Sequence, residues 1–375
     1  MKLLNHFKEL ISSALDRTGK NDHYYKVLAD TLNIDSDSNY IFSTAEHLSP
    51  FNYASTVSNI YPLSVIHAAL PELFDGIICM AGSLIPLDNE DYPRGVIGID
   101  NNNQPVRINL KPQKVKKSFS LILDSTTVLP GEVERADYAL KNILYDSAYK
   151  STYAQQLIYI MTELYNIWKI PRNRPLPLRV YSLEEVALTI LTELILNNDL
   201  IINSILFDPK IRTQLYRSLK NISCAWSDTN GTFLFWHSNN NKLHRMEEID
   251  NNLVSSDYTV NLSPAALLEA IRKKELYPCV FLSLFCVSYL PGIPVTGGSN
   301  QFKYYQSMIY AMNNLNITCR SQDLSLYGYG TTDFTTFPIN HKDFLPQQGA
   351  GVFLGLKETV IETVMKELGK RDVIL

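Results

Sequence analysis

The stretch Gly76–Ala81, which reads GIICMA, is a continuous run of apolar residues. Such a run is typical of a strand in the middle of a parallel sheet, where both faces are covered. A shorter β-prone run, Tyr40–Thr44, precedes it, and a helical pattern extends between the two as far as Leu70. Strand, helix and strand in this order predict an α/β fold with a parallel sheet, whose functional groups lie at the carboxyl ends of the strands.

Further elements are predicted along the chain. Two β-hairpins are indicated by alternating strands on either side of asparagine runs, at 101–103 and 239–241. Ser263–Pro264 predicts a helix start, because serine is a preferred cap and proline suits the first helical position. We also predict a buried strand over the apolar run Cys279–Leu290, followed by a glycine-containing turn and a helix that extends to about Leu315.

The middle of the chain has a different character. From 132 to 219 the apolar spacing is helical, and no Gly/Ser linker separates this segment from its neighbours. The chain has 375 residues, more than one average domain of about 150. We therefore predict a discontinuous α/β core, 1–131 and 223–375, with β-hairpin additions and a helical insertion at 132–222.

The composition limits the classes of partner. With 34 Lys and Arg against 38 Asp and Glu, the net charge is −4, which gives no overall attraction to nucleic acid or to an anionic membrane. The most apolar run is shorter than the ~20 residues of a membrane helix. The 5 cysteines are widely spaced and lack zinc-ligand spacing, which indicates buried thiols. We expect a cytoplasmic protein that acts on a small molecule and binds neither nucleic acid nor membrane, and the oligomeric state stays open.

The turn Gly297-Gly298-Ser299-Asn300 is a candidate cofactor site. Two glycines let a ligand approach the backbone, and the N–H groups at a helix start attract phosphate or carboxylate. ATP or ADP is the candidate cofactor, although the sequence is not a Walker loop. The alternative is a tight turn in which Ser299 or Asn300 caps the helix. Tyr304 either contacts the substrate or belongs to the core.

The loop that follows the strand at 76–81 contains acidic residues, an amide and an arginine. Asp88 is the candidate general base toward an amine, and Arg94 can hold a carboxylate with two hydrogen bonds. Asn89 and Asp91 are candidate substrate contacts. The alternative is a solvent-exposed turn with no role in binding.

His47 follows the first strand. An imidazole at this point can move protons near neutral pH, and we predict a catalytic role for it. Ser49 and Asn52, a few residues further on, are candidate substrate-binding residues. The alternative is a histidine that is hydrogen-bonded for structural reasons.

The order of these segments resembles the enzyme family that adds cysteine during bacillithiol biosynthesis. The segments that carry the resemblance are Tyr40–Tyr53, Ile77–Asp91, Gly231–Arg245, Asn261–Leu268 and Gly297–Tyr305. The resemblance implies a Rossmann-like core and a ligase that adds cysteine or another amino acid to a metabolite. The chain departs from the family in its first loop, which has no glycine or glutamine, and in its acidic loop, which has no histidine.

Three functional hypotheses follow. The first is a biosynthetic enzyme that forms an amide C–N bond between an amine and an activated carboxyl group. The second is a non-catalytic or regulatory protein that binds a ligand and has kept the fold, which would explain the departures in the loops. The third is a nucleotide-dependent transferase, in which carboxylates such as Asp88 and Asp91 would bind Mg²⁺.

Overall fold

The computed structural model describes most of the chain between residues 22 and 317. The described residues are 22–44, 46–48, 72–84, 95–99, 105–110, 138–167, 177–220, 231–297 and 299–315, with 12, 67, 119, 121, 133, 134, 222, 226 and 317. The chain divides into two compact units, and each is described by itself. Unit 1 comprises Met1–Ser13, Asn39–Ser182 and Leu324–Leu375, and unit 2 comprises Ala14–Ser38 and Leu183–Asp323.

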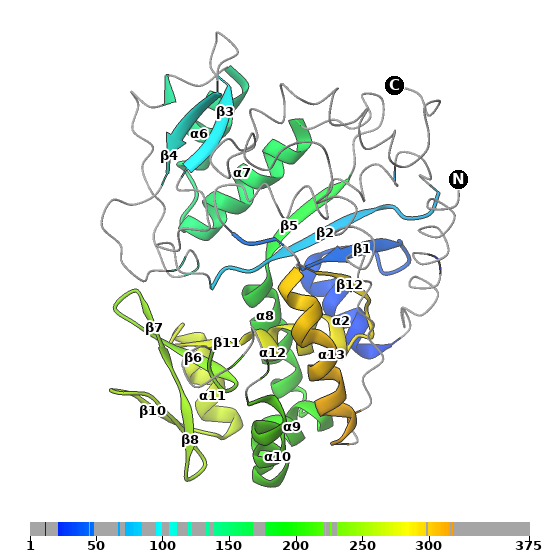
Figure 1. The fold of residues 1–375 in the computed structure, drawn as a ribbon, viewed down its shortest axis with the longest axis vertical. Coiled ribbons are helices and arrows are strands. Elements are labelled where there is room, and N and C mark those ends of the chain that lie inside the picture. Colours follow the sequence, from blue (N-terminus) through cyan, green and yellow to red (C-terminus); the bar gives the residue numbers. More distant parts are fainter. Residues whose placement is uncertain are drawn as a thin grey trace. The chain divides into compact units, whose positions relative to one another are not determined.

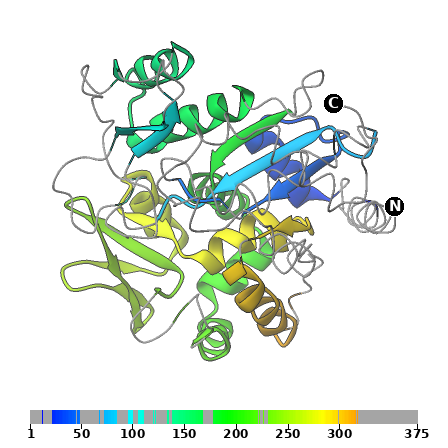
Figure 2. The ribbon, with the colours of Figure 1, turned by 45° about the horizontal axis from the view of Figure 1, so that its top comes forward.

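Unit 1 is built on parallel strands. β1 (Tyr40–Ser43), β2 (Gly76–Ala81) and β5 (Leu178–Ser182) are hydrogen-bonded neighbours in the order β1-β2-β5. They lie side by side in both Figure 1 and Figure 2. All residues of β2 are buried, as its apolar run predicts. The predicted α/β fold with a parallel sheet is confirmed.

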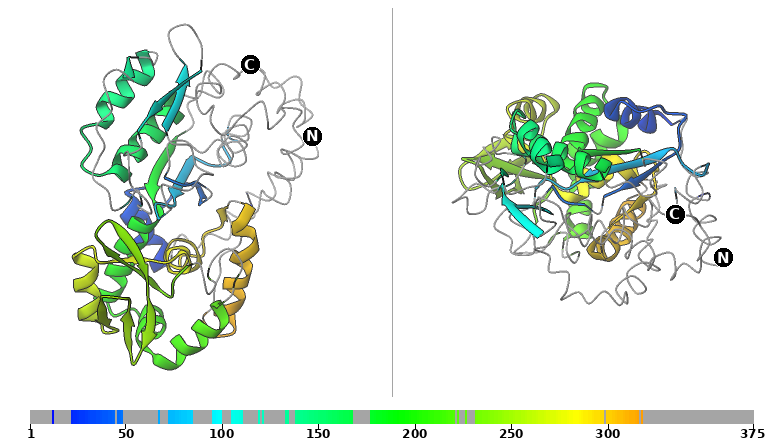
Figure 3. Two further views of the ribbon diagram at one scale, coloured as in Figure 1. Left: turned by 60° about the vertical axis from the view of Figure 1, so that its left-hand side comes forward. Right: turned by 90° about the horizontal axis from the view of Figure 1, so that it is seen from above.

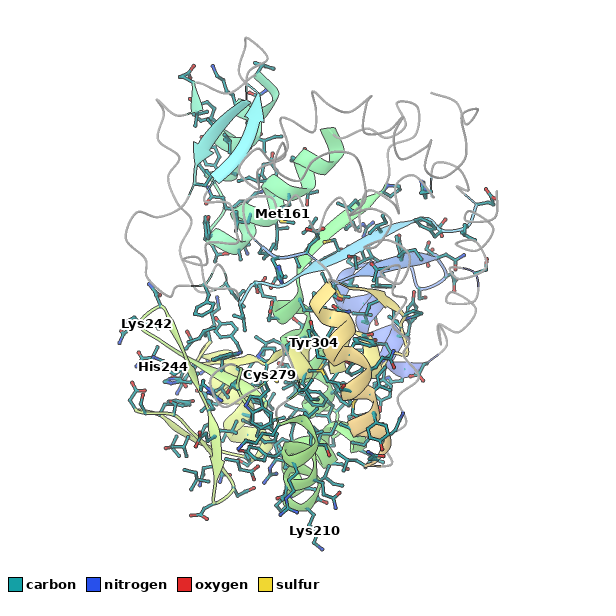
Figure 4. The ribbon with its side chains drawn as sticks, viewed as in Figure 1. Met161, Lys210, Lys242, His244, Cys279 and Tyr304 are labelled. Atoms are coloured by element: carbon teal, nitrogen blue, oxygen red, sulfur yellow. The ribbon has the colours of Figure 1, made fainter. Side chains whose placement is uncertain are left out.

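A hairpin and two helices complete the described part of unit 1. The hairpin of β3 (Gly95–Ile99) and β4 (Pro105–Asn109) confirms the first hairpin prediction. α7 (Tyr153–Ile167) packs against β5, and α6 (Tyr138–Ser147) packs against α7, as Figures 1 and 3 show. The core face of α7 includes Met161, which is fully buried (Figure 4).

β5 lies inside the segment that we predicted to be helical from 132 to 219, so that prediction is wrong at 178–182. Side chains of β5 alternate between buried and more exposed positions, and α8 (Leu183–Leu196) begins at the next residue. Because no turn residues separate the strand from the helix, the helical period of α8 hides the strand. The predicted insertion at 132–222 coincides with neither compact unit, and its boundaries stay a prediction.

Helices make up the first half of unit 2. α8 packs against α2 (His23–Leu32), and α9 (Leu200–Phe207) and α10 (Pro209–Leu219) follow it in the chain. The carboxylates of Asp199 and Asp208 accept hydrogen bonds from backbone N–H groups at the starts of α9 and α10. These caps end one helix and start the next within a few residues.

Small antiparallel sheets make up the second half. One sheet contains β6 (Phe235–Asn239), β7 (Lys242–Arg245) and β11 (Leu276–Pro278), and the other contains β8 (Glu247–Ile249), β9 (Asn252–Val254) and β10 (Thr259–Asn261). The second hairpin prediction is confirmed, and Asn240 and Asn241 turn it with positive φ angles of 50° and 58°. α11 (Pro264–Arg272) begins at the predicted proline and packs against β10 and β11 (Figure 3).

The apolar run at 279–290 is helical, so the buried strand predicted there is wrong. It forms α12 (Val280–Leu284) and a turn of π-helix, η3 (Phe285–Tyr289). A uniformly apolar run has neither a strand period nor a helix period, and only its length favours the helix. A two-residue strand, β12 (Val295–Thr296), and the predicted helix, α13 (Ser299–Asn313), follow it.

Among the described residues, no single helix has the length and apolar character to cross a bilayer, and α8 and α9 meet that standard only as a pair bent by 101°.

Arg212 joins α10 to the turn between β8 and β9. Its side chain is fully buried, its Nε donates to Glu248 Oε1 at 2.9 Å, and its Nη2 forms an ion pair with the same oxygen at 2.8 Å. Nη1 donates to the carbonyl oxygen of Leu206 at 2.8 Å, and Nη2 also donates to Asn251 Oδ1. The guanidinium group therefore satisfies acceptors from three segments of unit 2.

We expect Arg212→Met to lower the free energy of unfolding by about 3–5 kcal/mol, because a carboxylate and a carbonyl are left without their donor. The matched control is Lys210→Met on the same helix, where the side chain is exposed (Figure 4) and the change should stay within about 0.5 kcal/mol. Urea unfolding of both variants measures the difference. Equal effects of the two substitutions would contradict this role for Arg212.

Candidate functional site

Most of the predicted site residues lie outside the described residues. These are Ser49, Asn52, Asp88, Asn89, Asp91, Arg94 and Gly298, and the roles predicted for them stay predictions. His47 lies in unit 1, at the carboxyl end of β1. Gly297, Ser299, Asn300 and Tyr304 lie together in unit 2, around the start of α13.

Beyond β1, the chain continues beside the end of β2. The backbone N–H of Gly82 donates to the carbonyl oxygen of Glu46 at 2.9 Å, and the N–H of Leu48 donates to the carbonyl oxygen of Gly82 at 2.7 Å. These two bonds hold Glu46, His47 and Leu48 in a short parallel bridge. The sheet geometry thus fixes the backbone of Glu46 at the edge where ligands bind in α/β proteins.

The side chain of Glu46 is completely buried. Its exposed fraction is 0%, and neither carboxyl oxygen has a hydrogen-bond partner among the described residues. Burial raises the pKa of this carboxyl well above its ordinary value of 4.5. An ionised carboxylate without a partner would be very costly in such a place, so the group takes up a proton instead. Glu46 is therefore a neutral carboxylic acid at neutral pH.

Cys79 of β2 is a neighbour of Glu46. Burial and then the interaction with Glu46 raise the pKa of the Cys79 thiol, so the sulfur stays protonated and is a poor nucleophile. The register places Cys79 opposite Ser43, the last residue of β1, whose side chain is also fully buried. Cys79, Cys279 and Cys286 are buried free thiols, as predicted.

Two serine hydroxyls join the ends of β2 and β5. Ser83 Oγ and Ser182 Oγ lie 2.9 Å apart, and both side chains are buried. Hydroxyl groups donate and accept, so such a pair can bind either a carbonyl oxygen or an N–H group of a ligand. We call Ser43, Glu46, Cys79, Ser83 and Ser182 the strand-end site.

His47 is partly exposed, but most of its ring is surrounded by protein atoms. This desolvation lowers its pKa from 6.5 to about 4. The imidazole is therefore neutral at neutral pH, and it can accept a proton only weakly. Its predicted catalytic role stays a prediction.

The glycine turn of unit 2 has a structural explanation. Gly297 is buried, and a Cβ atom there would collide with the side chain of Gln301, with Gln301 Cγ only 2.7 Å away. Ser299 and Asn300 are the first residues of α13, and Tyr304 is half-buried on the next turn (Figure 4). The missing side chain of Gly297 makes room for Gln301. The space beside Gly297 is therefore occupied by the Gln301 side chain, and the cofactor role predicted for this turn stays a prediction.

Unit 2 also contains a polar network and a small cavity. Ser288 Oγ and Tyr305 Oη lie 2.6 Å apart in the core, and Ser288 also donates to the carbonyl oxygen of Ile293. The cavity beside Cys279 and Phe233 has a volume of about 10 Å³, which is room for one water molecule and not for a metabolite. Among the described residues, no group of three or more His, Cys, Asp or Glu is placed to bind a metal.

Sequence reasoning missed Glu46, Ser83 and Ser182 as site residues. Each of these residues follows or ends a strand of the parallel sheet. That position at a strand end could have indicated them as site residues. In the sequence, Glu46 is marked only as the residue before His47. Its burial could not be read from the sequence, because it depends on the backbone bonds to Gly82.

We expect Glu46→Met to raise the free energy of unfolding by about 1–3 kcal/mol at neutral pH, because it removes a buried polar group that has no partner. The exposed Glu72 of the same unit gives the matched control, Glu72→Met, with a change within about 0.5 kcal/mol. Chemical unfolding monitored by circular dichroism measures both. A loss of stability in Glu46→Met would contradict the unpartnered state of the carboxyl.

The pH dependence of stability has a definite sign. Glu46 is neutral when folded and ionised when unfolded above pH 4.5, so its contribution falls as pH rises from there toward its raised pKa. His47 acts oppositely, and its contribution falls as pH drops from 6.5 to about 4. We expect Glu46→Gln to flatten the alkaline side of the stability profile only. Flattening of the acidic side instead would contradict this assignment.

We expect Gly297→Ala to lower the free energy of unfolding by about 1–3 kcal/mol, because the new methyl group overlaps the side chain of Gln301. Combining it with Gln301→Ala should cost less than the sum of the two single changes. A double-mutant cycle by urea unfolding measures this coupling. Strict additivity would show that the two residues do not compete for the same space.

Comparison of the chain with protein-family models finds no match, and comparison with curated proteins finds none either. The resemblance to the cysteine-adding family thus stays a prediction carried by the segments quoted above. The function has to be inferred from the buried carboxyl and hydroxyl groups at the strand ends.

Proposed function

We propose that the chain is a cytoplasmic small-molecule enzyme, with a Rossmann-like core, that forms an amide C–N bond between an amine and an activated carboxyl group. Cysteine or another amino acid is the proposed amine. The observation that carries the proposal is the Glu46 carboxyl, which is buried without a partner at the carboxyl end of β1.

A buried carboxyl suits the proton transfer that this reaction needs. An amine attacks a carbonyl carbon only through its unprotonated nitrogen, so a base must take a proton from the ammonium form. A carboxylate in dry surroundings has a raised pKa, which brings it closer to that of the amine and makes the transfer easier. The carboxylate form of Glu46, present once its own proton has left, takes the role of base that the sequence suggested for Asp88.

Serine hydroxyls lie at the same edge of the parallel sheet. Ser83 and Ser182 lie at the ends of β2 and β5, the edge where ligands bind in open α/β sheets. Their hydroxyls can position the carbonyl oxygen of the acyl donor next to the amine. The activated carboxyl group enters as an acyl thioester or acyl phosphate, and its C–S or C–O bond breaks as the C–N bond forms, so that the thiol or phosphate is the leaving group. ATP or ADP at the glycine turn stays a separate prediction, and the proposed amide-forming step uses neither nucleotide.

The experiment is an amide-formation assay with the full chain. Acyl thioesters and acyl phosphates are each combined with a panel of amino acids, including cysteine, and amide products are detected by mass spectrometry. We expect a product with wild type, and a rate lowered about 100- to 10,000-fold in Glu46→Gln. Glu72→Gln, which is exposed in the same unit, should keep the full rate.

Two results would count against the proposal. Full turnover by Glu46→Gln would remove Glu46 from the reaction. Binding of amino acids without any amide product would favour the alternative, a protein that binds its ligand at the same site without chemistry.

A further inference from the structure

The buried Glu46 carboxyl indicates which chemical class of ligand the site binds. Both oxygens of Glu46 lie inside the protein, and neither has a hydrogen-bond partner among the described residues. Buried polar groups in folded proteins nearly always have partners, so an exception calls for an explanation in terms of function. A ligand that brings N–H donors to these oxygens would satisfy both of them.

The described titratable neighbours of Glu46 carry no positive charge. Among the described residues, Cys79 is the titratable group that faces it from β2, and this thiol stays protonated and neutral. His47, its neighbour in the chain, is neutral at neutral pH because its pKa is lowered to about 4. Within the described part of the chain, the strand-end site therefore holds a neutral acid and no cation to balance an ionised one.

We infer that the strand-end site takes its amine as a primary ammonium ion, and that binding of this ion releases one proton from Glu46. The inference rests on the proposed function for the identity of the substrate as an amine. The charge balance is R–NH₃⁺ plus the neutral Glu46 carboxylic acid, giving the R–NH₃⁺ and Glu46 carboxylate pair plus one H⁺ in solution. The ion pair replaces the unpartnered acid.

The ammonium ion is favoured for two reasons. It carries the charge that makes a buried carboxylate stable, and it carries three N–H donors that can reach the carboxylate oxygens. A quaternary ammonium ion has the same charge but no N–H donor, so it leaves both oxygens unsatisfied. The site is thus selective for primary amines over their fully methylated analogues.

Proton release makes the affinity depend on pH. While Glu46 is neutral in the empty site and the amine is charged in solution, each pH unit should raise the apparent affinity about tenfold. The affinity becomes constant at pH values at which Glu46 is already ionised before the ligand binds. Binding and deprotonation of Glu46 are therefore one coupled step.

The test uses methylammonium as the probe and the full chain. Isothermal titration in two buffers of different protonation enthalpy counts the protons released, and thermal unfolding with and without the probe at about pH 6 and about pH 8 gives the pH dependence. We expect about one proton released per bound ion and a larger stabilisation at the higher pH. Tetramethylammonium should bind at least tenfold more weakly.

The controls are Glu46→Gln, which keeps the shape of the side chain, and Glu72→Gln. Glu46→Gln should release no proton and lose the pH dependence, whereas Glu72→Gln should behave as wild type. Binding of methylammonium without proton release, or equal binding of tetramethylammonium, would overturn the inference. The wild-type proton count decides the question even if Glu46→Gln fails to fold.

The result of the proton-release experiment can be distinguished from the result of the amide-formation assay. Proton release with methylammonium but no amide from any acyl donor would support the inference and contradict the proposed reaction. Amide formation without proton release on amine binding would support the reaction and contradict the inference.

Discussion

The parallel ladder around β2 is the constraint on which unit 1 depends. β2 pairs with β1 on one side and with β5 on the other, and all of its residues are buried, so every backbone group has to find its partner in a neighbouring strand. This requirement sets the register and brings the carboxyl ends of the strands to one edge. The bonds between Gly82 and the segment 46–48 extend the ladder past the end of β1. These two hydrogen bonds hold the backbone of Glu46 beside β2, where its side chain is buried.

This arrangement costs free energy at one side chain, that of Glu46. A neutral glutamic acid without a partner costs about 1–3 kcal/mol, and an ionised one would cost far more. Groups of this kind lower stability and are commonly found where a ligand binds. The buried hydroxyls of Ser43, Ser83 and Ser182, at the ends of β1, β2 and β5, make the edge polar without adding charge. The site is therefore matched to a ligand that brings its own positive charge.

The sequence predicted the parts of the fold that depend on local pattern. Residues 76–81 are apolar throughout because β2 is central, and the asparagines at 240–241 turn a hairpin because they tolerate positive φ. The prediction failed where the pattern has no period, at 279–290, and where β5 joins α8 without a turn. Of the candidate site, the sequence indicated the strand ends. It could not indicate Glu46, because burial of a polar side chain results from tertiary packing and not from its neighbours in sequence.

The central claim is that the Glu46 carboxyl is protonated in the folded protein at neutral pH. Carbon-13 NMR of the chain labelled at the glutamate side-chain carboxyl tests this directly, with the signal of Glu46 assigned by its loss in Glu46→Gln. The account predicts a chemical shift of the protonated acid at neutral pH and a titration well above 4.5. A Glu46 signal that is already ionised at neutral pH and titrates near 4.5 would contradict it.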